Sequence, residues 1–223
     1  MTKANALNQQ VTQYNTLVGD AGNQIANVAP GNAGQVLTSN GVSLAPTYQS
    51  IASAGLVLLQ SKTATTSATI DFTSLISTTY KNYKVVISNV FMSNQNRLGM
   101  LVSTDNGATW VNSGYQFGYI NAPSTTGLFT GAGGGAQSEF FLTNNIEMSN
   151  TQPTTSFELN IFIGDASNDT TYYGNGLMNI ASTGTYYLLN SGYIGAGVVN
   201  AIRFFAEAGN IQQGYFSLYG YSF

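Results

Sequence analysis

The residues of this sequence best suited to chemistry are its nine carboxylates. A glycoside hydrolase needs two carboxylates that face each other across a sugar bond. One loop, Gly164 to Asp169, brings two carboxylates together with Asn and Ser, and such hard oxygen ligands can hold calcium. The simpler interpretation, which we favour, is a solvated turn between two strands. The nine are Asp20, Asp71, Asp105, Glu139, Glu147, Glu158, Asp165, Asp169 and Glu207.

Other catalytic groups are missing from the sequence. It contains no His and no Cys, which excludes thiol catalysis, imidazole acid–base catalysis and the usual zinc sites. The Ser and Thr hydroxyls have no histidine base, and no Ser-x-x-Lys spacing occurs. The run GAGGGA at 131–136 lacks a P-loop lysine and is interpreted as a flexible loop. We therefore expect no enzyme, no cofactor and no metal site.

Tyrosines grouped with amides point to binding rather than catalysis. Such groups can stack on the apolar face of a sugar while amide and hydroxyl groups form hydrogen bonds with it. Alternatively, tyrosines in β proteins commonly line strands and contacts between chains. The candidate ligand-binding residues are Tyr115, Tyr119, Tyr172, Tyr173, Asn175, Tyr186 and Tyr187, with Tyr193 nearby.

The segment STDNGATW, residues 103–110, fits the SxDxGxTW pattern of the Asp-box hairpin found in sialidase propellers and other β proteins. Asp105 can accept hydrogen bonds from turn amides, Gly107 supplies a positive φ, and Trp110 packs beneath the turn. A propeller would repeat the motif in each blade, whereas it occurs once here. We therefore interpret it as a well-made β-turn.

The composition excludes further classes of protein. Only 7% of the residues are charged, against about 25% in an average protein. The net charge is −3 and the basic residues are not clustered, so tight nucleic-acid binding is not expected. The start, MTKANALNQQ, lacks the apolar run of a signal peptide, and no stretch approaches the roughly 20 apolar residues of a membrane span. We expect synthesis in the cytoplasm and no membrane insertion.

The first thirty residues show a heptad-like spacing of apolar residues, which predicts a helix that associates with copies of itself. Gly19 and Gly22 weaken this prediction, since each costs about 1 kcal/mol inside a helix. The alternative is a shorter helix from Ala4 to Val18 that packs on another surface. In either case the segment is an attachment device. The residues expected to anchor or oligomerise the chain are Leu7, Val11, Tyr14, Val18, Ile25 and Val28.

The next segment, residues 31–54, is expected to form a narrow neck. Gln35 to Ser39 is typical of a short strand, Asn40–Gly41 of a tight turn, and Ala45 to Gln49 of a second extended piece. A hairpin this small is marginal alone, so we expect several chains to pair here.

GNAGQVLTSNGVSLAPTYQ, residues 31–49, resembles the GxxGQVLTSNGxxxAPxWQ stalk motif of tail-fibre and related virion proteins of tailed bacteriophages, with Tyr48 in place of Trp. The chain's end, GYFSLYGYSF, is similar to the closing strand of many such proteins. In this family the motif usually joins an anchoring part to a distal β-rich domain. The resemblance implies an oligomeric fibre, most often a trimer, located in the virion.

Residues 55–223 are predicted to form about ten strands with turns between them, which indicates an all-β sandwich with a jelly-roll-like topology. The last two strands are expected to form a hairpin across EAGN, residues 207–210. The predicted strands are 55–60, 68–72, 83–91, 98–103, 114–120, 137–143, 156–163, 170–173, 176–180, 198–206 and 214–219.

Taken together, the sequence predicts a mainly β protein with an attachment segment (1–30), a neck (31–54) and a β-sandwich head (55–223). The resemblance implies a homotrimeric phage fibre of the receptor-binding type. Its N-terminal segment would dock on virion proteins and its head would bind a host-surface glycan or protein. One alternative is a structural head fibre or decoration protein of the capsid. An enzymatic alternative is a small depolymerase, which would need a carboxylate pair across a groove.

Overall fold

The computed structural model describes residues 15–19, 22, 25–50, 55–77, 79–80, 82–143, 148, 155–180, 184–195 and 197–222. The chain divides into two compact units, Met1–Ser53 and Ala54–Phe223. The regular structure of the described residues consists of antiparallel β-strands, and no helix occurs among them. The mainly β character predicted from the sequence is therefore confirmed.

The first unit contains a hairpin where a helix was predicted. Strands β1 (Thr16–Gly19) and β2 (Ile25–Val28) pair antiparallel, with Thr16 opposite Val28 and Gly19 opposite Ile25. The helix prediction is wrong over these two strands. The β-branched residues at 16, 18, 25 and 28 favour extended backbone, and the glycines at 19 and 22 interrupt a helix. The predicted seam positions Leu7, Val11 and Tyr14 lie outside the described residues.

A second hairpin is formed by the stalk motif. Strands β3 (Gln35–Thr38) and β4 (Thr47–Ser50) pair antiparallel, as the sequence predicted. The connection is longer than a two-residue turn and is organised by Asn40, whose side-chain amide donates to the Ala45 carbonyl (2.6 Å) and accepts from Gln49 (2.7 Å). Gly31 packs against the Tyr48 side chain. A Cβ at position 31 would lie only 2.6 Å from the Tyr48 Cβ, so a larger residue there would clash.

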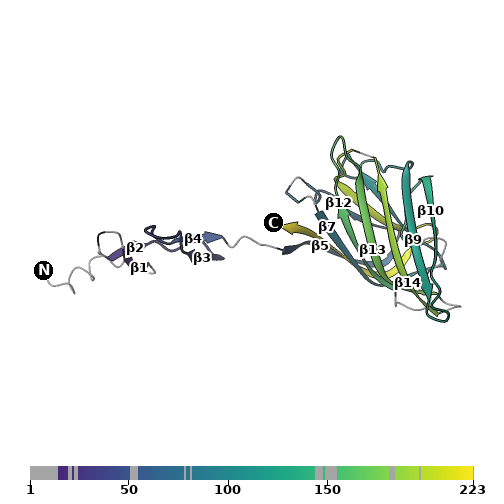
Figure 1. Cartoon of the computed structure of the whole chain (residues 1–223), viewed down its shortest axis with the longest axis horizontal. Helices are drawn as coiled ribbons and strands as arrows, with labels where there is room; N and C mark the ends of the chain where they lie inside the picture. Colours follow the sequence, from purple (N-terminus) through teal and green to yellow (C-terminus); the bar gives the residue numbers. More distant parts are fainter. Residues whose placement is uncertain are drawn as a thin grey trace. The chain divides into compact units, whose positions relative to one another are not determined.

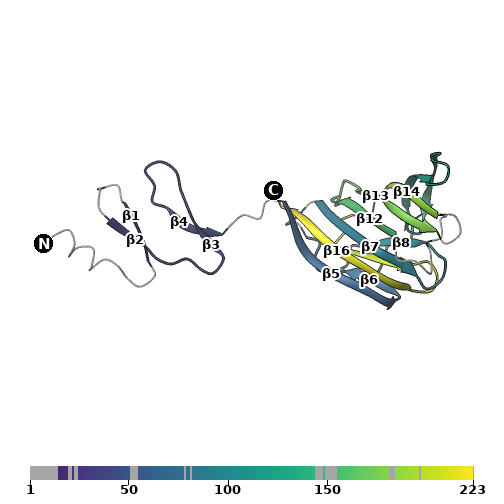
Figure 2. The same cartoon turned by 90° about the horizontal axis from the view of Figure 1, so that it is seen from below.

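The second unit, here called the head, contains two sheets. The larger has the strand order β10-β9-β14-β13-β12-β7-β16-β5, and the smaller has the order β11-β8-β15-β6. Figure 1 shows β12, β13, β14, β9 and β10 side by side, and Figure 2 shows β5, β16 and β7. The strands are β5 Gly55–Ser67, β6 Thr69–Phe72, β7 Asn82–Met92, β8 Leu98–Ser103, β9 Tyr115–Pro123, β10 Thr130–Gln137, β11 Phe140–Phe141, β12 Thr155–Phe162, β13 Thr170–Ile180, β14 Gly184–Ile194, β15 Ala201–Ala206 and β16 Ile211–Ser222.

The head's core lies between the two sheets. The ring of Phe204, on β15 in the smaller sheet, lies 5.5 Å from that of Phe216, on β16 in the larger sheet. At the other side of the core, the Phe140 ring is 4.6 Å from Tyr115 and 4.5 Å from Tyr172. All five rings are buried, as the alternation of apolar residues along these strands requires. One face of the larger sheet therefore covers the core, and the opposite side is called the outer face below.

Three details of the predicted strand pattern are wrong. The glycine run at 131–136 is an edge strand, β10, rather than a flexible loop, because its backbone pairs with β9 so closely that a Cβ at Gly133 would lie 2.7 Å from the Phe117 carbonyl oxygen. Strand β14 was not predicted, since apolar residues occupy both of its faces and no alternation marks it. Strands β15 and β16 belong to different sheets, so residues 207–210 cross between sheets instead of closing a hairpin.

Candidate functional site

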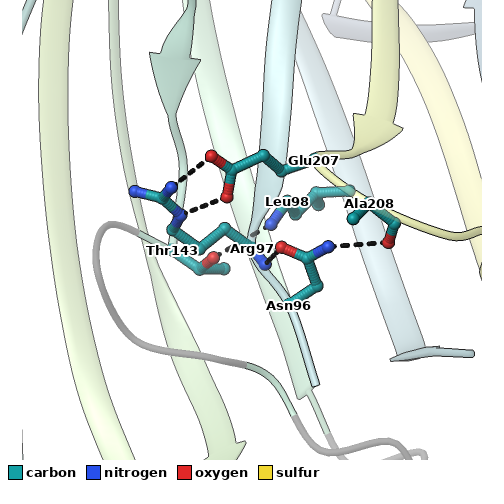
Figure 3. A network of polar contacts seen from close by, with 6 residues as sticks. All are labelled: Asn96, Arg97, Leu98, Thr143, Glu207 and Ala208. Atoms are coloured by element: carbon teal, nitrogen blue, oxygen red, sulfur yellow. Dashed lines mark hydrogen bonds and ion pairs between the residues drawn. The ribbon is translucent and has the colours of Figure 1, made fainter. Parts of the chain in front are cut away.

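Most of the described carboxylates are engaged in structural contacts. Asp71 and Arg203 form a two-pronged ion pair with distances of 2.8 and 2.7 Å. Lys84 binds Glu158 at 2.5 Å, and this contact raises the lysine pKa. Arg97 binds Glu207 with two hydrogen bonds beside the crossing from β15 to β16, where Asn96 also donates to the Ala208 carbonyl (Figure 3). These pairs hold strands together.

Glu139 is different, because it is buried and its Oε1 has no hydrogen-bond partner among the described residues. Burial, and to a smaller extent the nearby Glu207, raise the pKa of its carboxyl to about 7, although Arg97 partly opposes the shift. A perturbed carboxyl can mark an active site. Here Glu139 precedes the short strand β11 at the edge of the core and lines none of the hollows described below.

The segment STDNGATW forms a tightly bonded turn. Asp105 accepts from both the amide (2.8 Å) and the hydroxyl (2.5 Å) of Thr109, and Ser103 also donates to it (2.7 Å). These hydrogen bonds lower the pKa of Asp105 to about 2, and the bond from the Thr109 hydroxyl contributes most. The Trp110 ring lies against Gly107, at φ 87°, and under the Arg203 guanidinium at 4.3 Å. The sequence interpretation as a well-made β-turn is confirmed.

The loop at 164–169 is also a turn. The Asp165 carboxylate accepts hydrogen bonds from the backbone amides of Ser167 (2.8 Å) and Asn168 (3.0 Å). Within the described part of the chain, no group of three or more acidic, His or Cys side chains is placed to hold a metal ion. The hydrogen bonds of Asp165 close the loop into a turn, as the sequence indicated.

Two of the predicted ligand-binding tyrosines are in the core. Tyr115 is fully buried (0% exposed); its hydroxyl donates to the Val111 carbonyl (2.8 Å) and accepts from the Val102 amide (3.0 Å), and burial raises its pKa to about 12. Tyr172 is 3% exposed, and burial raises its pKa. Neither ring is at a surface, because each belongs to the inward-facing set of its strand. Both therefore serve packing rather than contact with a ligand.

The other predicted residues fall into two groups. Tyr173, Asn175 and Tyr187 lie on the outer face, and so does Tyr193. Tyr119 is half-buried on β9; it lines a hollow together with Arg97, Phe141 and Gln137, and it also lines the main hollow of the outer face described below. Tyr186 is part of β14, and its side chain lies outside the described residues. The structure thus places Tyr173, Asn175, Tyr187 and Tyr193 on the outer face, and it brings Tyr119 and Tyr173 to the same hollow.

A shallow trough crosses the outer face over β9, β14 and β13. Gly118, Ser191 and Tyr173 are register neighbours across these three strands, so they form one row. The main hollow has a volume of about 450 Å³, and a second hollow of about 310 Å³ shares Gly118 and Ser191 with it. Ile120 and Leu189 line the first hollow, and Gln116 and Tyr193 line the second. The seven residues named here are called the outer trough.

The outer trough combines an open floor with aromatic walls. Its floor is Gly118 and Ser191, which fill little space, while Tyr173 stands at one side with 51% of its surface exposed. The Tyr173 ring is stacked on Phe162, with ring centres 5.8 Å apart, and this contact fixes its orientation. An exposed ring held by stacking, beside a floor of small residues, can receive a flat, partly apolar ligand such as a sugar ring.

The outer trough is lined by uncharged residues. None of the described residues that line it is charged. On the same face, Lys84 forms an ion pair with Glu158, and the two charges neutralise each other. Hydrogen bonding would come from the side chains of Gln116, Ser191 and the tyrosines. This arrangement suits a neutral hydroxylated ligand better than a charged one.

Sequence reasoning missed most of the trough's residues. The missed residues have types that carry no chemical signal of their own: Gly118, Ser191, Ile120, Leu189 and Gln116. They meet only because β9 pairs with β14, whose residues lie 60 or more positions later in the sequence. One available signal was the glycine in the middle of the predicted strand 114–120, since such a glycine often marks a close approach or an open surface. The tyrosines were found because their side chains carry their own chemical signal.

No protein-family model, curated protein or solved structure matches this chain. In the part of the chain that the structure describes, no helix has the length and apolarity needed to cross a membrane.

Proposed function

We propose that this chain is a homo-oligomeric fibre protein of a tailed-bacteriophage particle, with a neck formed by the stalk motif and a jelly-roll-like head. Its N-terminal segment docks on virion proteins, and its head binds a host-surface glycan. The observation that carries the binding role is the outer trough, an uncharged hollow with ordered aromatic walls on an otherwise regular sheet. The virion location rests on the stalk motif at 31–49.

The proposed ligand is a neutral glycan. Stacking on Tyr173 and Tyr193 would provide contact with the apolar face of a sugar, and the amide of Gln116 and the hydroxyl of Ser191 would bond its hydroxyl groups. Each head would bind weakly. Several heads on one neck raise the effective concentration, so an oligomer binds a repetitive polysaccharide much more tightly than a single head does.

A hydrolytic role is less well supported than binding. No carboxylate is found among the described residues that line the outer trough, whereas glycoside hydrolysis needs a pair. We therefore propose no catalytic residue, and neither a metal nor a cofactor.

The test of binding uses Gly118→Val. A Cβ at Gly118 would meet only the Ala132 carbonyl oxygen, at 3.9 Å, so the fold accepts the side chain while its methyl groups enter the trough. The full-length chain is applied to an array of neutral and acidic bacterial polysaccharides. We expect retention on neutral members, and at least tenfold less with Gly118→Val. Ser88→Val, a change on the same face at strand β7, which lies outside both the trough and strand β5, serves as control.

Two results would contradict this proposal. Equal retention of Gly118→Val and the parent chain would place binding outside the trough. Absence of binding to every polysaccharide would favour the alternative of a structural head fibre or capsid decoration.

The test of assembly is sedimentation of the full-length chain beside a chain that starts at Gly55. We expect the full-length chain to sediment as a trimer and the head as a smaller species. Monomers in both samples would contradict the homo-oligomer as a property of the free protein.

A further inference from the structure

We propose that the free edge and outer side of β5, together with the last residues of β16, form an interface between copies of this chain. The inference rests on the proposed homo-oligomer and specifies which part of the head faces the other copies. It is independent of what the outer trough binds.

The first observation is a group of exposed apolar side chains at the start of β5. Leu56 is 48% exposed and Leu58 is 54% exposed. In the sheet register Leu56 lies opposite Tyr221 and Leu58 opposite Tyr219, so the four side chains share the outer face. Adjacent exposed leucines beside half-buried tyrosines are typical of a contact surface rather than of a face in permanent contact with water.

The second observation is the edge itself. Strand β5 is 13 residues long and ends the larger sheet, with β16 as its neighbour on one side. Free edges are normally protected by prolines or by charged side chains that discourage further pairing. Strand β5 contains no proline, and its one charged residue, Lys62, extends over the Phe72 ring at 5.8 Å. The register shift opposite Leu218 and Tyr219 marks one bulge in this strand; away from it, no strand among the described residues pairs with this edge, which can therefore accept another copy.

The third observation concerns the occupant of this surface. Strand β4 ends at Ser50 and β5 begins at Gly55, and five residue steps span at most about 18 Å. The hairpin β3–β4 exposes Val36 and Leu37, and an isolated hairpin is marginal in stability. Copies that associate through these hairpins would hold their β5 starts at a high effective concentration, because the connection on each chain is short. The short connection between β4 and β5 therefore makes a second copy of this chain the expected partner of the β5 surface.

The interface leaves the outer trough open. Five strand steps separate β5 from β14, which corresponds to about 24 Å across the sheet. Between them lie polar side chains of the outer face, including the Lys84–Glu158 pair and Asn160, which accepts a hydrogen bond from the Tyr221 hydroxyl at 3.0 Å. Copies can therefore pack at one side of the face while the other side binds ligand.

The test introduces single cysteines into the full-length chain, which contains none of its own. Leu56→Cys and Leu58→Cys place a thiol at the proposed interface. Leu177→Cys, at a site 52% exposed on β13 of the same face, is the matched control. Each variant is treated with a short bis-maleimide and separated on a denaturing gel. Sedimentation of the untreated variants, and their melting curves, show whether each has kept its assembly and fold.

We expect at least tenfold more cross-linked chain from Leu56→Cys or Leu58→Cys than from Leu177→Cys. Equal or greater cross-linking at Leu177, in variants that sediment as oligomers, would overturn the interface while leaving the proposed assembly intact. Absence of cross-linking at both leucines in such oligomers would do the same. Monomeric sedimentation of all variants and of the parent chain would instead remove the assembly on which the interface depends.

Discussion

The two units of this chain bury their apolar residues to very different extents. In the head, Phe72, Phe204 and Phe216 are fully buried between two sheets. In the first unit, Val36, Leu37 and Val42 are all exposed, and Val42 is 96% exposed. The hairpins there are joined by polar side chains, such as the bond of 2.7 Å between the hydroxyls of Thr16 and Tyr48.

The two units therefore draw their stability from different interactions. The head has a core that can hold it together as a single chain, because burial of apolar surface is the main favourable term in folding. The first unit has hydrogen bonds but little burial, and exposed polar contacts contribute modestly. We infer that its apolar side chains are used in association.

Phe216→Ala should destabilise the head by about 3–5 kcal/mol, because it removes a ring packed against Phe204 and leaves a cavity. Urea unfolding of the chain 55–223, followed by circular dichroism, measures this. Leu37→Ala in the full-length chain is the comparison, and it should leave head unfolding unchanged within about 0.5 kcal/mol. A large effect of Leu37→Ala on the head would show that the two units are not independent.

Glu139→Gln should stabilise the head by about 2 kcal/mol at pH 8 and have little effect at pH 4. The carboxyl pKa rises from 4.5 to about 7 on folding, so the folded head keeps this proton longer than the unfolded chain. The associated stability is present below pH 4.5 and is lost as pH rises towards and through 7. Urea midpoints of both proteins across this range provide the measurement. A stability difference that does not change with pH would contradict the assignment.

Ser103→Ala should cost the head about 1–2 kcal/mol. The buried hydroxyl accepts from the Gly107 amide at 2.9 Å and donates to Asp105, so its loss leaves a turn amide unsatisfied. Ser61→Ala, whose exposed hydroxyl bonds Ser217 on the outer face, is the control and should have a smaller effect. Thermal unfolding compares the two. An equal loss of stability in both variants would mean that the burial of the Ser103 hydroxyl adds nothing to the stability of the turn.

Asn40→Ala should have the smallest effect, confined to the first unit. Its amide joins the Ala45 carbonyl and the Gln49 side chain, so its removal should lower the opening free energy of the β3–β4 hairpin by up to about 1 kcal/mol. Amide hydrogen exchange at 35–38 should become up to about fivefold faster, while exchange in β7 stays the same. Faster exchange in β7 as well would show coupling between the units.

Much of the fold could be predicted because it depends on local patterns. The alternation of Phe157, Leu159 and Ile161 places the core face of β12, and the turn at 103–110 is visible from residue types alone. The pairings that build the outer trough could not be predicted this way. Ser191 meets Gly118 and Tyr173 only through the strand order β9-β14-β13, and no spacing in the sequence encodes that order.

The wrong predictions have physical causes of the same kind. The heptad-like spacing of the first thirty residues includes β-branched residues, which favour strands, and glycines, which disfavour helices. In the structure Val18 and Ile25 lie on the paired strands of a hairpin instead of on one helix. Glycine repeats look like a loop until a close neighbouring backbone requires them, as at Gly133. Tyr115 and Tyr173 are the same residue type in similar surroundings of sequence, and only the side of the sheet decides that one is core and the other surface.

The nearly bare floor at Gly118 and Ser191 has an evolutionary consequence. Gly118 has space above it and no positive φ, so a larger residue there adds β-propensity rather than strain. Mutations that reshape the floor would therefore not have to be preceded by stabilising changes elsewhere. Under the proposed function, such a position would allow the choice of ligand to change by single substitutions.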